Sequence, residues 1–173
     1  LSLGLKKGEV LEVIRSDKME LVDQLLRGQV GCLLMLPDGS QSMDQTFLGG
    51  VLPGSFDPLH QGHMELARVA EGLLGVDVAY ELSVTNVEKP SLDRVEIDRR
   101  ISQFATARKV ALTRAPTFDQ KAKLFPGCTF IIGWDTAVRL LDPRYYGGDA
   151  YQMRIALNDI RSFDCRLLVA GRL

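Results

Sequence analysis

The two histidines of the chain lie three residues apart, in the segment 54–63, whose sequence is GSFDPLHQGH. A helix that begins here would place His60 and His63 on one side. Imidazole rings donate hydrogen bonds and can become cationic, which suits a site where negative charge develops. Gly54 allows a ligand to approach the backbone, and a helix N-terminus adds unpaired N–H groups. These residue types predict a phosphate-binding loop.

The spacing within this segment is specific. Seven fixed residues in the pattern G-x-F-D-P-x-H-x-G-H would recur by chance at roughly one in a billion positions. Pro58 fixes its own backbone and restricts Asp57, and Gly62 keeps the helix start free of a bulky side chain. The alternative is that His60 and His63 are ordinary surface or capping residues of a strand-to-helix turn.

The surrounding pattern alternates between strands and helices. Short apolar segments predict strands at 47–52, 77–85, 110–112, 128–132 and 165–170, and helical spacing predicts helices at 62–74, 93–104, 117–124, 134–141 and 151–160. Strict alternation implies βαβ units, and therefore an α/β domain with a mostly parallel sheet covered on both faces. Ligands of such sheets bind beyond the carboxyl ends of the strands. Residues 54–62 and 133–135 are two of the loops at that edge.

The first 45 residues have a different pattern. Residues 17–27 have a helical apolar stripe, 30–36 could form a short buried strand, and 37–40 (PDGS) are typical of a turn. We expect residues 1–45 to be a lead-in or the tail of an upstream domain, and residues 46–173 to form the main domain.

Composition excludes several classes of function. The net charge of −1 argues against a broad electrostatic surface for nucleic acid or an anionic membrane. Cys32, Cys128 and Cys165 are far apart and show no metal-binding spacing, so reduced thiols are expected. No uncharged apolar run approaches the roughly 20 residues of a membrane-spanning helix. We expect a cytoplasmic protein without a nucleic-acid or membrane partner. Formation of a homo-oligomer is compatible with the sequence.

The segment GSFDPLHQGH resembles the first signature of the nucleotidylyltransferase superfamily, whose members are cytidylyltransferase-like. Its form is typical of nicotinamide and nicotinate mononucleotide adenylyltransferases. The similarity covers about residues 46–170 and implies a Rossmann-like, doubly wound fold. It also implies that His60 and His63 are catalytic and hold the triphosphate, with His63 nearest the reacting α-phosphate.

A second segment, Gly133-Trp134-Asp135, resembles the G-x-D of these adenylyltransferases, which lies at the ribose and adenine of ATP. Trp134 could stack on a ring or simply pack. The ATP-binding residues that the resemblance implies are Gly54, Ser55, Phe56, Asp57, Gly62, Gly133 and Asp135. The candidates for binding the second substrate are Asn86, Lys89, Arg100, Trp134 and Arg139, with Tyr145 nearby. For Lys89 and Arg100 a solvated loop or helix face is the alternative.

The implied reaction is in-line attack by a mononucleotide phosphate on the α-phosphate of ATP, with release of pyrophosphate. Catalysis then depends on positioning and charge stabilisation. Mg²⁺ is expected through the ATP phosphates, without a dedicated metal site in the protein. The alternatives are a cytidylyltransferase, a pantetheine-phosphate adenylyltransferase, or a regulatory module that binds ATP without turnover. The family also has a Ser/Thr-rich I-S-x-T-x-I/R signature after its last core strand, which the sequence does not reach, so we expect a piece of a longer polypeptide.

Overall fold

Seven strands form one sheet in the order β2-β1-β5-β4-β3-β6-β7. The computed structural model of the chain describes residues 20–45, 47–86 and 90–171. The strands are β1 Cys32–Met35, β2 Gln41–Met43, β3 Gly50–Pro53, β4 Val78–Ser83, β5 Lys109–Thr113, β6 Thr129–Gly133 and β7 Arg166–Ala170. Strands β5, β4, β3, β6 and β7 are mutually parallel, whereas β1 is antiparallel to β5 and β2 is antiparallel to β1. The expected Rossmann-like α/β fold is confirmed.

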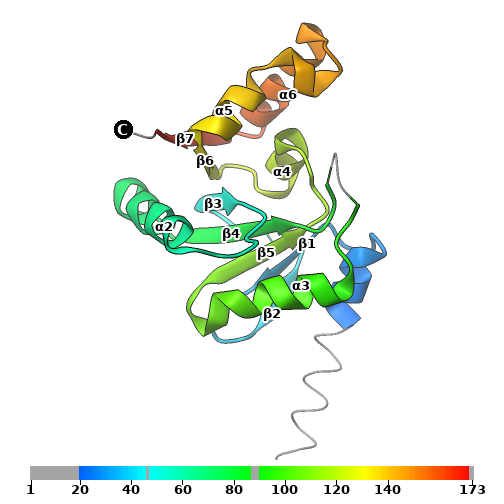
Figure 1. Cartoon of the computed structure of the whole chain (residues 1–173), viewed down its shortest axis with the longest axis vertical. Helices are drawn as coiled ribbons and strands as arrows, with labels where there is room; N and C mark the ends of the chain where they lie inside the picture. The colour runs from blue at the N-terminus through cyan, green and yellow to red at the C-terminus, as the bar shows by residue number, and fades with distance from the viewer. Residues whose placement is uncertain (1–19, 46, 87–89, 172–173) are drawn as a thin grey trace, which may run out of the picture.

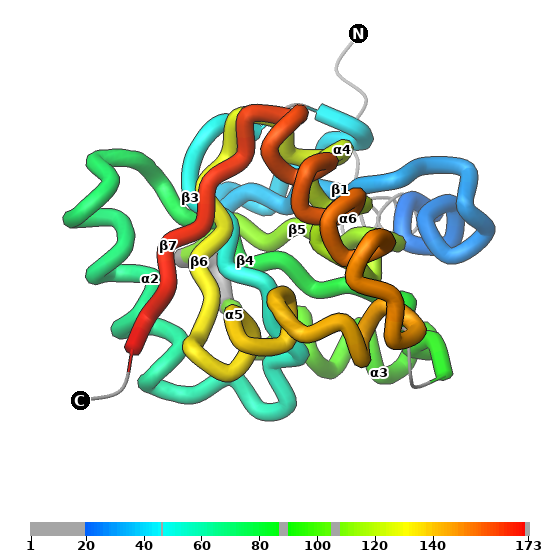
Figure 2. Tube along the Cα trace, turned by 90° about the horizontal axis from the view of Figure 1, so that it is seen from above, coloured from blue at the N-terminus to red at the C-terminus, as the bar shows by residue number. Residues whose placement is uncertain are grey.

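Helices cover both faces of this sheet (Figure 1). They are α2 Gln61–Leu74, α3 Arg94–Ile101, α4 Phe118–Leu124, α5 Trp134–Leu140 and α6 Ala150–Ser162, with 3₁₀ turns η1 Ser102–Ala107 and η2 Pro143–Tyr146. One buried cluster joins the sheet to α2 and α3, and a second joins the opposite face to α4 and α6. Figure 2 shows β3, β6 and β7 between α2 on one side and α6 on the other.

Strand β4 shows why the sheet is central. Val78, Tyr80 and Leu82 belong to the cluster beneath α2 and α3, while Ala79 belongs to the cluster on the other face. Side chains alternate between the two faces of a strand, so burial of both sets requires a layer of helices on each side. The sequence predicts a strand at 77–85, and the structure has a strand within this range, at Val78–Ser83.

Two predicted boundaries differ from the structure by three residues, more than the others. The strand expected at 47–52 begins at Gly50, because Phe47 reaches the core from the loop before it. The helix expected to run to 104 ends at Ile101 and continues as η1. There the hydroxyl of Ser102 donates to the carbonyl oxygen of Arg99 at 2.7 Å, a bond that competes with the regular helical ladder.

The described residues before 46 pack against the same sheet. Residues 20–26 are helical, and Val22 and Leu25 are buried in the cluster that also contains α2 and α3. The predicted strand at 30–36 forms β1, which pairs with β5. These residues extend the sheet, and the division of the chain at residue 45 stays a prediction. Among the described residues, no helix is both long enough and apolar enough to cross a membrane.

Candidate active site

The two motifs meet at the point where the strand order reverses. After β3 the chain turns to α2 and returns as β4 on one side, whereas β6 lies on the other side of β3. The loop 54–60 and the segment Gly133–Asp135 therefore leave neighbouring parallel strands at the same edge. Open α/β sheets bind ligands at such a reversal.

The backbone of the loop is shaped by Phe56. Its ring is fully buried and makes edge-to-face contacts with Tyr80, Phe104 and His63, with ring centroids 5.1 to 5.5 Å apart. A Cβ atom on Gly54 would lie 2.7 Å from this ring, so only glycine fits there. Phe56 itself has φ of 46°, a left-handed conformation that costs roughly 1–3 kcal/mol for a residue with a side chain. The contacts around Phe56 must therefore hold its backbone in this conformation.

The structure brings the two histidines together at the start of α2. The main-chain N–H of His60 donates to Nδ1 of His63 at 3.3 Å, and the rings stack with centroids 3.7 Å apart. A Cβ atom on Gly62 would lie 3.1 Å from the His60 ring, which explains the glycine between them. Because Nδ1 of His63 accepts a hydrogen bond, its neutral ring carries the proton on Nε2 and can donate there.

The charge state of His63 follows from its surroundings. Burial lowers the pKa of His63 below its usual value of 6.5, and the neighbouring His60 lowers it further. In the free protein the imidazole of His63 is therefore neutral at neutral pH. Proximity of a negative phosphate would favour its protonated form.

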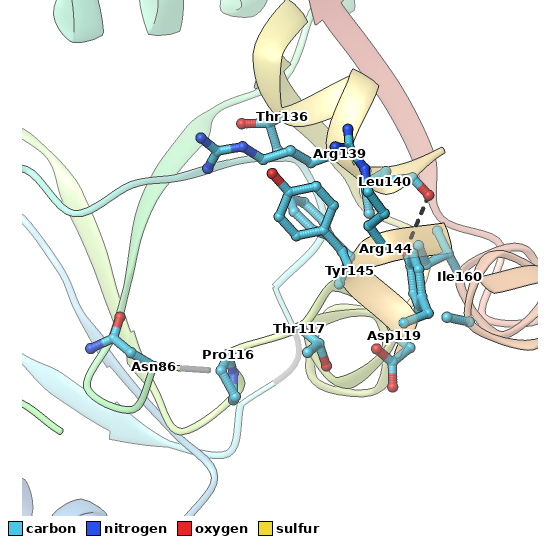
Figure 3. A pocket seen from close by; sticks show the side chains of 13 residues that line it. Asn86, Pro116, Thr117, Asp119, Thr136, Arg139, Leu140, Arg144, Tyr145 and Ile160 are labelled. Carbon is cyan, nitrogen blue, oxygen red and sulfur yellow. Dashed lines mark hydrogen bonds between the residues drawn. The ribbon is translucent and has the colours of Figure 1, made fainter. Parts of the chain in front are cut away.

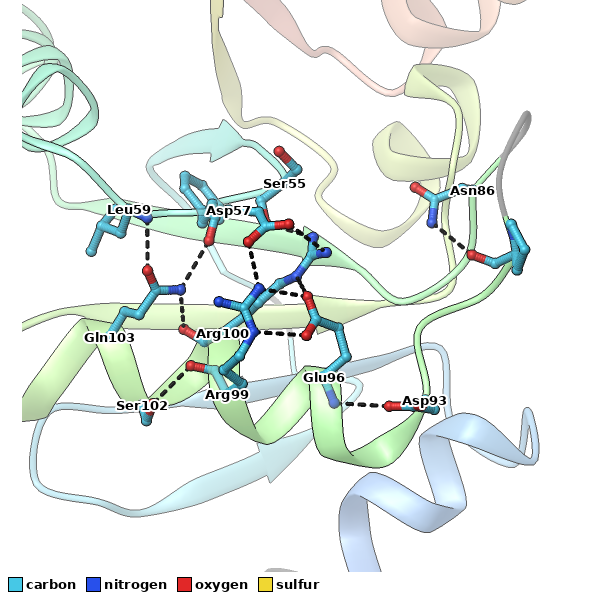
Figure 4. Close-up of polar contacts among 12 residues, drawn as sticks. Ser55, Asp57, Leu59, Asn86, Asp93, Glu96, Arg99, Arg100, Ser102 and Gln103 are labelled. Carbon is cyan, nitrogen blue, oxygen red and sulfur yellow. Dashed lines mark hydrogen bonds and ion pairs between the residues drawn. The ribbon is translucent and has the colours of Figure 1, made fainter.

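Helix α3 and η1 hold the loop from the side (Figure 4). Arg100 Nη1 donates to the carbonyl oxygen of Ser55 at 2.8 Å, and Gln103 Nε2 donates to that of Phe56 at 2.9 Å. The carboxylate of Asp57 pairs with Arg99 and, at 3.3 Å, with Arg100. Asp57 and Arg100 thus have partners within the protein, and their roles toward a ligand stay predictions. Gln103 was not predicted, since an isolated amide on a helix gives no sequence signal.

A second carboxylate completes this network. Glu96 accepts hydrogen bonds from Arg99 Nε at 2.7 Å and from Arg100 Nε at 2.7 Å. The hydrogen bonds from Arg99 and then from Arg100 lower the pKa of Glu96 to about 2, and the bond from Arg99 has the larger effect. The two arginines therefore connect Glu96 on α3 with Asp57 in the loop.

Two pockets adjoin each other, and the smaller one lies beside the loop. The smaller, about 180 Å³, is lined by Ser55, Asn86 and Arg100 among others, and the larger, about 560 Å³, by Asn86, Arg139 and Tyr145 among others. Asn86 and Pro116 line both. In the larger pocket the guanidinium of Arg139 lies 5.8 Å from the centre of the Tyr145 ring (Figure 3). A substrate with a phosphate and a ring could span the two.

A buried ion pair lines the smaller pocket. Lys121 on α4 donates to both carboxylate oxygens of Glu81 on β4, at 2.8 and 2.7 Å, and to the carbonyl oxygen of Ala115 at 2.6 Å. Thr113 donates to the same carboxylate at 2.5 Å. The Glu81 and Lys121 side chains are 1% and 5% exposed. Sequence reasoning missed this pair, because its members are 40 residues apart and match no motif.

The second motif lies at the start of α5. Gly133 precedes the helix, and a Cβ atom there would meet no other atom within 4 Å. Trp134 is 60% exposed, so it does not pack into the core, and Asp135 lies exposed in the first turn. Lys89 lies outside the described residues.

Within the described ranges, no three His, Cys, Asp or Glu side chains group closely enough to hold a metal ion. Entry of Mg²⁺ with the phosphates of a nucleotide stays an expectation.

Comparisons with known proteins address the family. One solved structure, a protein of unknown function from Archaeoglobus fulgidus, is 16% identical, with a TM-score of 0.38 over 73% of this chain and 90% of that one. No curated protein matches the chain. The model of the cytidylyltransferase-like family matches residues 51–154, more than half of the chain and including both motifs. The chain therefore belongs to the cytidylyltransferase-like family.

Proposed function

We propose that this nucleotidyltransferase domain transfers AMP from ATP to the phosphate of nicotinamide or nicotinate mononucleotide. An oxygen of the mononucleotide phosphate attacks the α-phosphorus of ATP, the bond to the bridging oxygen of the β-phosphate breaks, and pyrophosphate leaves. The observation that carries the proposal is the placement of GSFDPLHQGH and Gly133–Asp135 on adjacent parallel strands at the reversal of strand order.

The histidine pair supports the phosphate chemistry. With Nδ1 of His63 accepting from the backbone, Nε2–H is the group left to donate to an α-phosphate oxygen. Charge builds on that oxygen in the transition state, and a fixed donor there lowers the barrier. His60 lies in ring contact with His63 at the helix start, where it would bind the outer phosphates.

Gly133 supports a nucleoside position beside β6. Its φ is −75°, which any residue can adopt, and space is open around its Cβ direction. Neither backbone conformation nor internal packing therefore requires glycine. A glycine at this N-cap is compatible with close approach of a ligand, and Asp135 two residues later has a carboxylate that ribose or adenine donors could reach.

The two pockets support an acceptor with a phosphate and a ring. The smaller one adjoins the loop through Ser55, so it would take the phosphate near the reaction centre. The larger one presents the Tyr145 ring and the Arg139 guanidinium, which suit a flat pyridine ring. Asn86 lies between them and would contact the part of the acceptor that joins its two ends.

A substrate panel tests the proposal. Each mononucleotide, phosphopantetheine and glycerol phosphate is combined with ATP or CTP and Mg²⁺, and pyrophosphate release is followed. We expect release with ATP and a pyridine mononucleotide. Preference for CTP or for phosphopantetheine would move the protein to another member reaction of the family. ATP binding without pyrophosphate from any pair would identify a binding module.

A further inference from the structure

The carbonyl groups of the signature loop are held on the side of α3 and η1. Those of Ser55 and Phe56 accept hydrogen bonds from Arg100 and Gln103, at 2.8 and 2.9 Å. Figure 4 shows both side chains reaching the loop from the same direction. In a trans peptide the C=O and the following N–H point in opposite directions. The N–H groups of Phe56 and Asp57 are therefore directed away from α3.

Of these two N–H groups, that of Asp57 is available to a ligand, because Asp57 is exposed, whereas Phe56 is fully buried. In the described part of the chain, neither makes a hydrogen bond. Successive N–H groups that point the same way form a concave anion-binding surface. Phe56 has a left-handed backbone, and such a conformation persists only where its surroundings fix it. The orientation of the anion-binding groups thus depends on what holds the carbonyls.

Gln103 holds the loop at two points. Its Nε2 donates to the carbonyl oxygen of Phe56, and its Oε1 accepts from the N–H of Leu59 at 2.8 Å. The same amide also donates to the carbonyl oxygen of Arg100 at 3.3 Å, which fixes it to its own helix. The two points lie on either side of Asp57 and Pro58, so one side chain sets the span of the turn.

We propose that Gln103 is a positioning residue, which fixes the Phe56–Asp57 peptide and so orients the N–H group of Asp57 toward the triphosphate of a bound nucleotide. The inference rests on the proposed function, because it assumes that the loop binds a nucleotide. Arg100 also holds a carbonyl group of the loop, that of Ser55, but it lines the smaller pocket and could touch substrate directly. Gln103 lines neither pocket. A change at Gln103 therefore tests positioning alone.

The test replaces Gln103 with Met, which keeps the length of the side chain and removes both hydrogen-bonding groups. ATP affinity is measured by calorimetry, and steady-state rates give KM for ATP and for the acceptor. We expect ATP affinity to fall roughly 10- to 100-fold, because hydrogen bonds to a charged ligand weaken when their donor is misaligned. The acceptor KM should stay within about twofold, and the Leu59 amide should lose protection from hydrogen exchange.

Ser102→Ala is the matched control, because Ser102 is exposed on the same 3₁₀ turn and its hydroxyl bonds only the helix. Thermal unfolding checks that each variant is folded. Should the Met variant unfold, Gln103→Glu keeps the acceptor for Leu59 and removes the amide donor to the carbonyl oxygens of Phe56 and Arg100, and it should also weaken ATP binding.

The outcomes separate the two proposals. ATP affinity within about twofold of wild type in a folded Gln103→Met protein would overturn the positioning role and leave the proposed function intact. Equal loss of affinity for ATP and acceptor would also overturn it, because a general structural defect gives that result. A wild-type protein that binds neither ATP nor CTP would overturn the proposed function and this inference with it.

Discussion

The main chain of His60 and the ring of His63 are joined by a hydrogen bond from N–H to Nδ1, 3.3 Å long, and the two rings stack at 3.7 Å. This contact sets the tautomer of His63 before any ligand arrives. It also places the two rings within one helical turn, where a positive charge on His60 disfavours protonation of His63. Two predictions depend on this pair.

Removal of the His63 ring should abolish most turnover. We expect His63→Ala to lower kcat roughly 100- to 1000-fold, the usual effect of losing one fixed donor to a developing negative charge. The fold should persist, because the ring is only partly buried at a helix start. Pyrophosphate release under saturating substrates, with circular dichroism as a fold check, measures this.

Gln61→Ala is the control for that variant, since Gln61 is exposed on the same first turn. His60→Ala should mainly weaken nucleotide binding. A His63→Ala enzyme with near wild-type kcat would remove His63 from the mechanism, and a change confined to kcat in His60→Ala would assign His60 to the chemical step.

The lowered pKa of His63 predicts how stability depends on pH. The unfolded chain has the ordinary value near 6.5, and burial followed by His60 lowers the folded value. Between these two pKa values the unfolded state binds more protons than the folded state. The contribution of His63 to the free energy of unfolding is therefore fully retained above pH 6.5 and decreases as the pH falls below it. Urea unfolding at several pH values should show less of this loss in His63→Asn. An unchanged slope would contradict the shift.

Burial also predicts unreactive thiols. It raises the pKa of Cys32 to about 12 and that of Cys128 to about 11, and the thiolate is the reactive form. In the native protein at pH 8, we expect both to react with a disulfide reagent far more slowly than after denaturation. Mass spectrometry of the labelled peptides identifies each site, and rapid native labelling of Cys32 would contradict its burial.

The sequence was most informative where residues act locally. The motif 54–63 and the alternation of apolar segments predicted the loop, the helix after it and the parallel sheet. The pairing of β1 with β5 and the contacts of Gln103 with Phe56 and Leu59 were not predicted. They join segments more than 40 residues apart, and no periodicity encodes which distant partner a strand or an amide meets.

Loss of one member of the Glu81–Lys121 pair should lower the free energy of unfolding more than loss of both charges. Lys121→Met leaves the Glu81 carboxylate buried without its cation, which typically costs about 3–5 kcal/mol. Adding Glu81→Gln removes the uncompensated charge and should recover part of that loss. Urea unfolding of the single and double variants measures both.

Lys123→Met is the control, because Lys123 is exposed on the same helix. It should change the free energy of unfolding by less than about 0.5 kcal/mol. Equal effects of Lys121→Met and Lys123→Met would show that the buried contact contributes no more than a surface lysine.

Arg139 should determine which pyridine mononucleotide is used. Arg144 in the same pocket is already paired with Asp142 at 2.6 Å, whereas Arg139 makes no ion pair among the described residues and stacks against Tyr145. A carboxylate on the acceptor ring would meet that guanidinium, and a hydrogen bond between charged groups contributes about 1.5–3 kcal/mol. We therefore expect preference for nicotinate over nicotinamide mononucleotide. Arg139→Met should lower kcat/KM for nicotinate mononucleotide about 10- to 100-fold and leave the nicotinamide substrate nearly unchanged.

Two other charged residues of the larger pocket provide comparison variants for Arg139→Met. Asp119 lines the same pocket and carries the charge that would repel an acceptor carboxylate. Asp119→Asn should therefore keep or raise the preference for nicotinate, while Arg144→Gln, which removes an arginine already paired with Asp142, should leave the ratio of the two kcat/KM values unchanged. If Arg139→Met lowers both values by the same factor, Arg139 supports the pocket without selecting the acceptor. If the wild-type protein already prefers the amide, the guanidinium does not face the acceptor ring, and the larger pocket binds another part of the substrate.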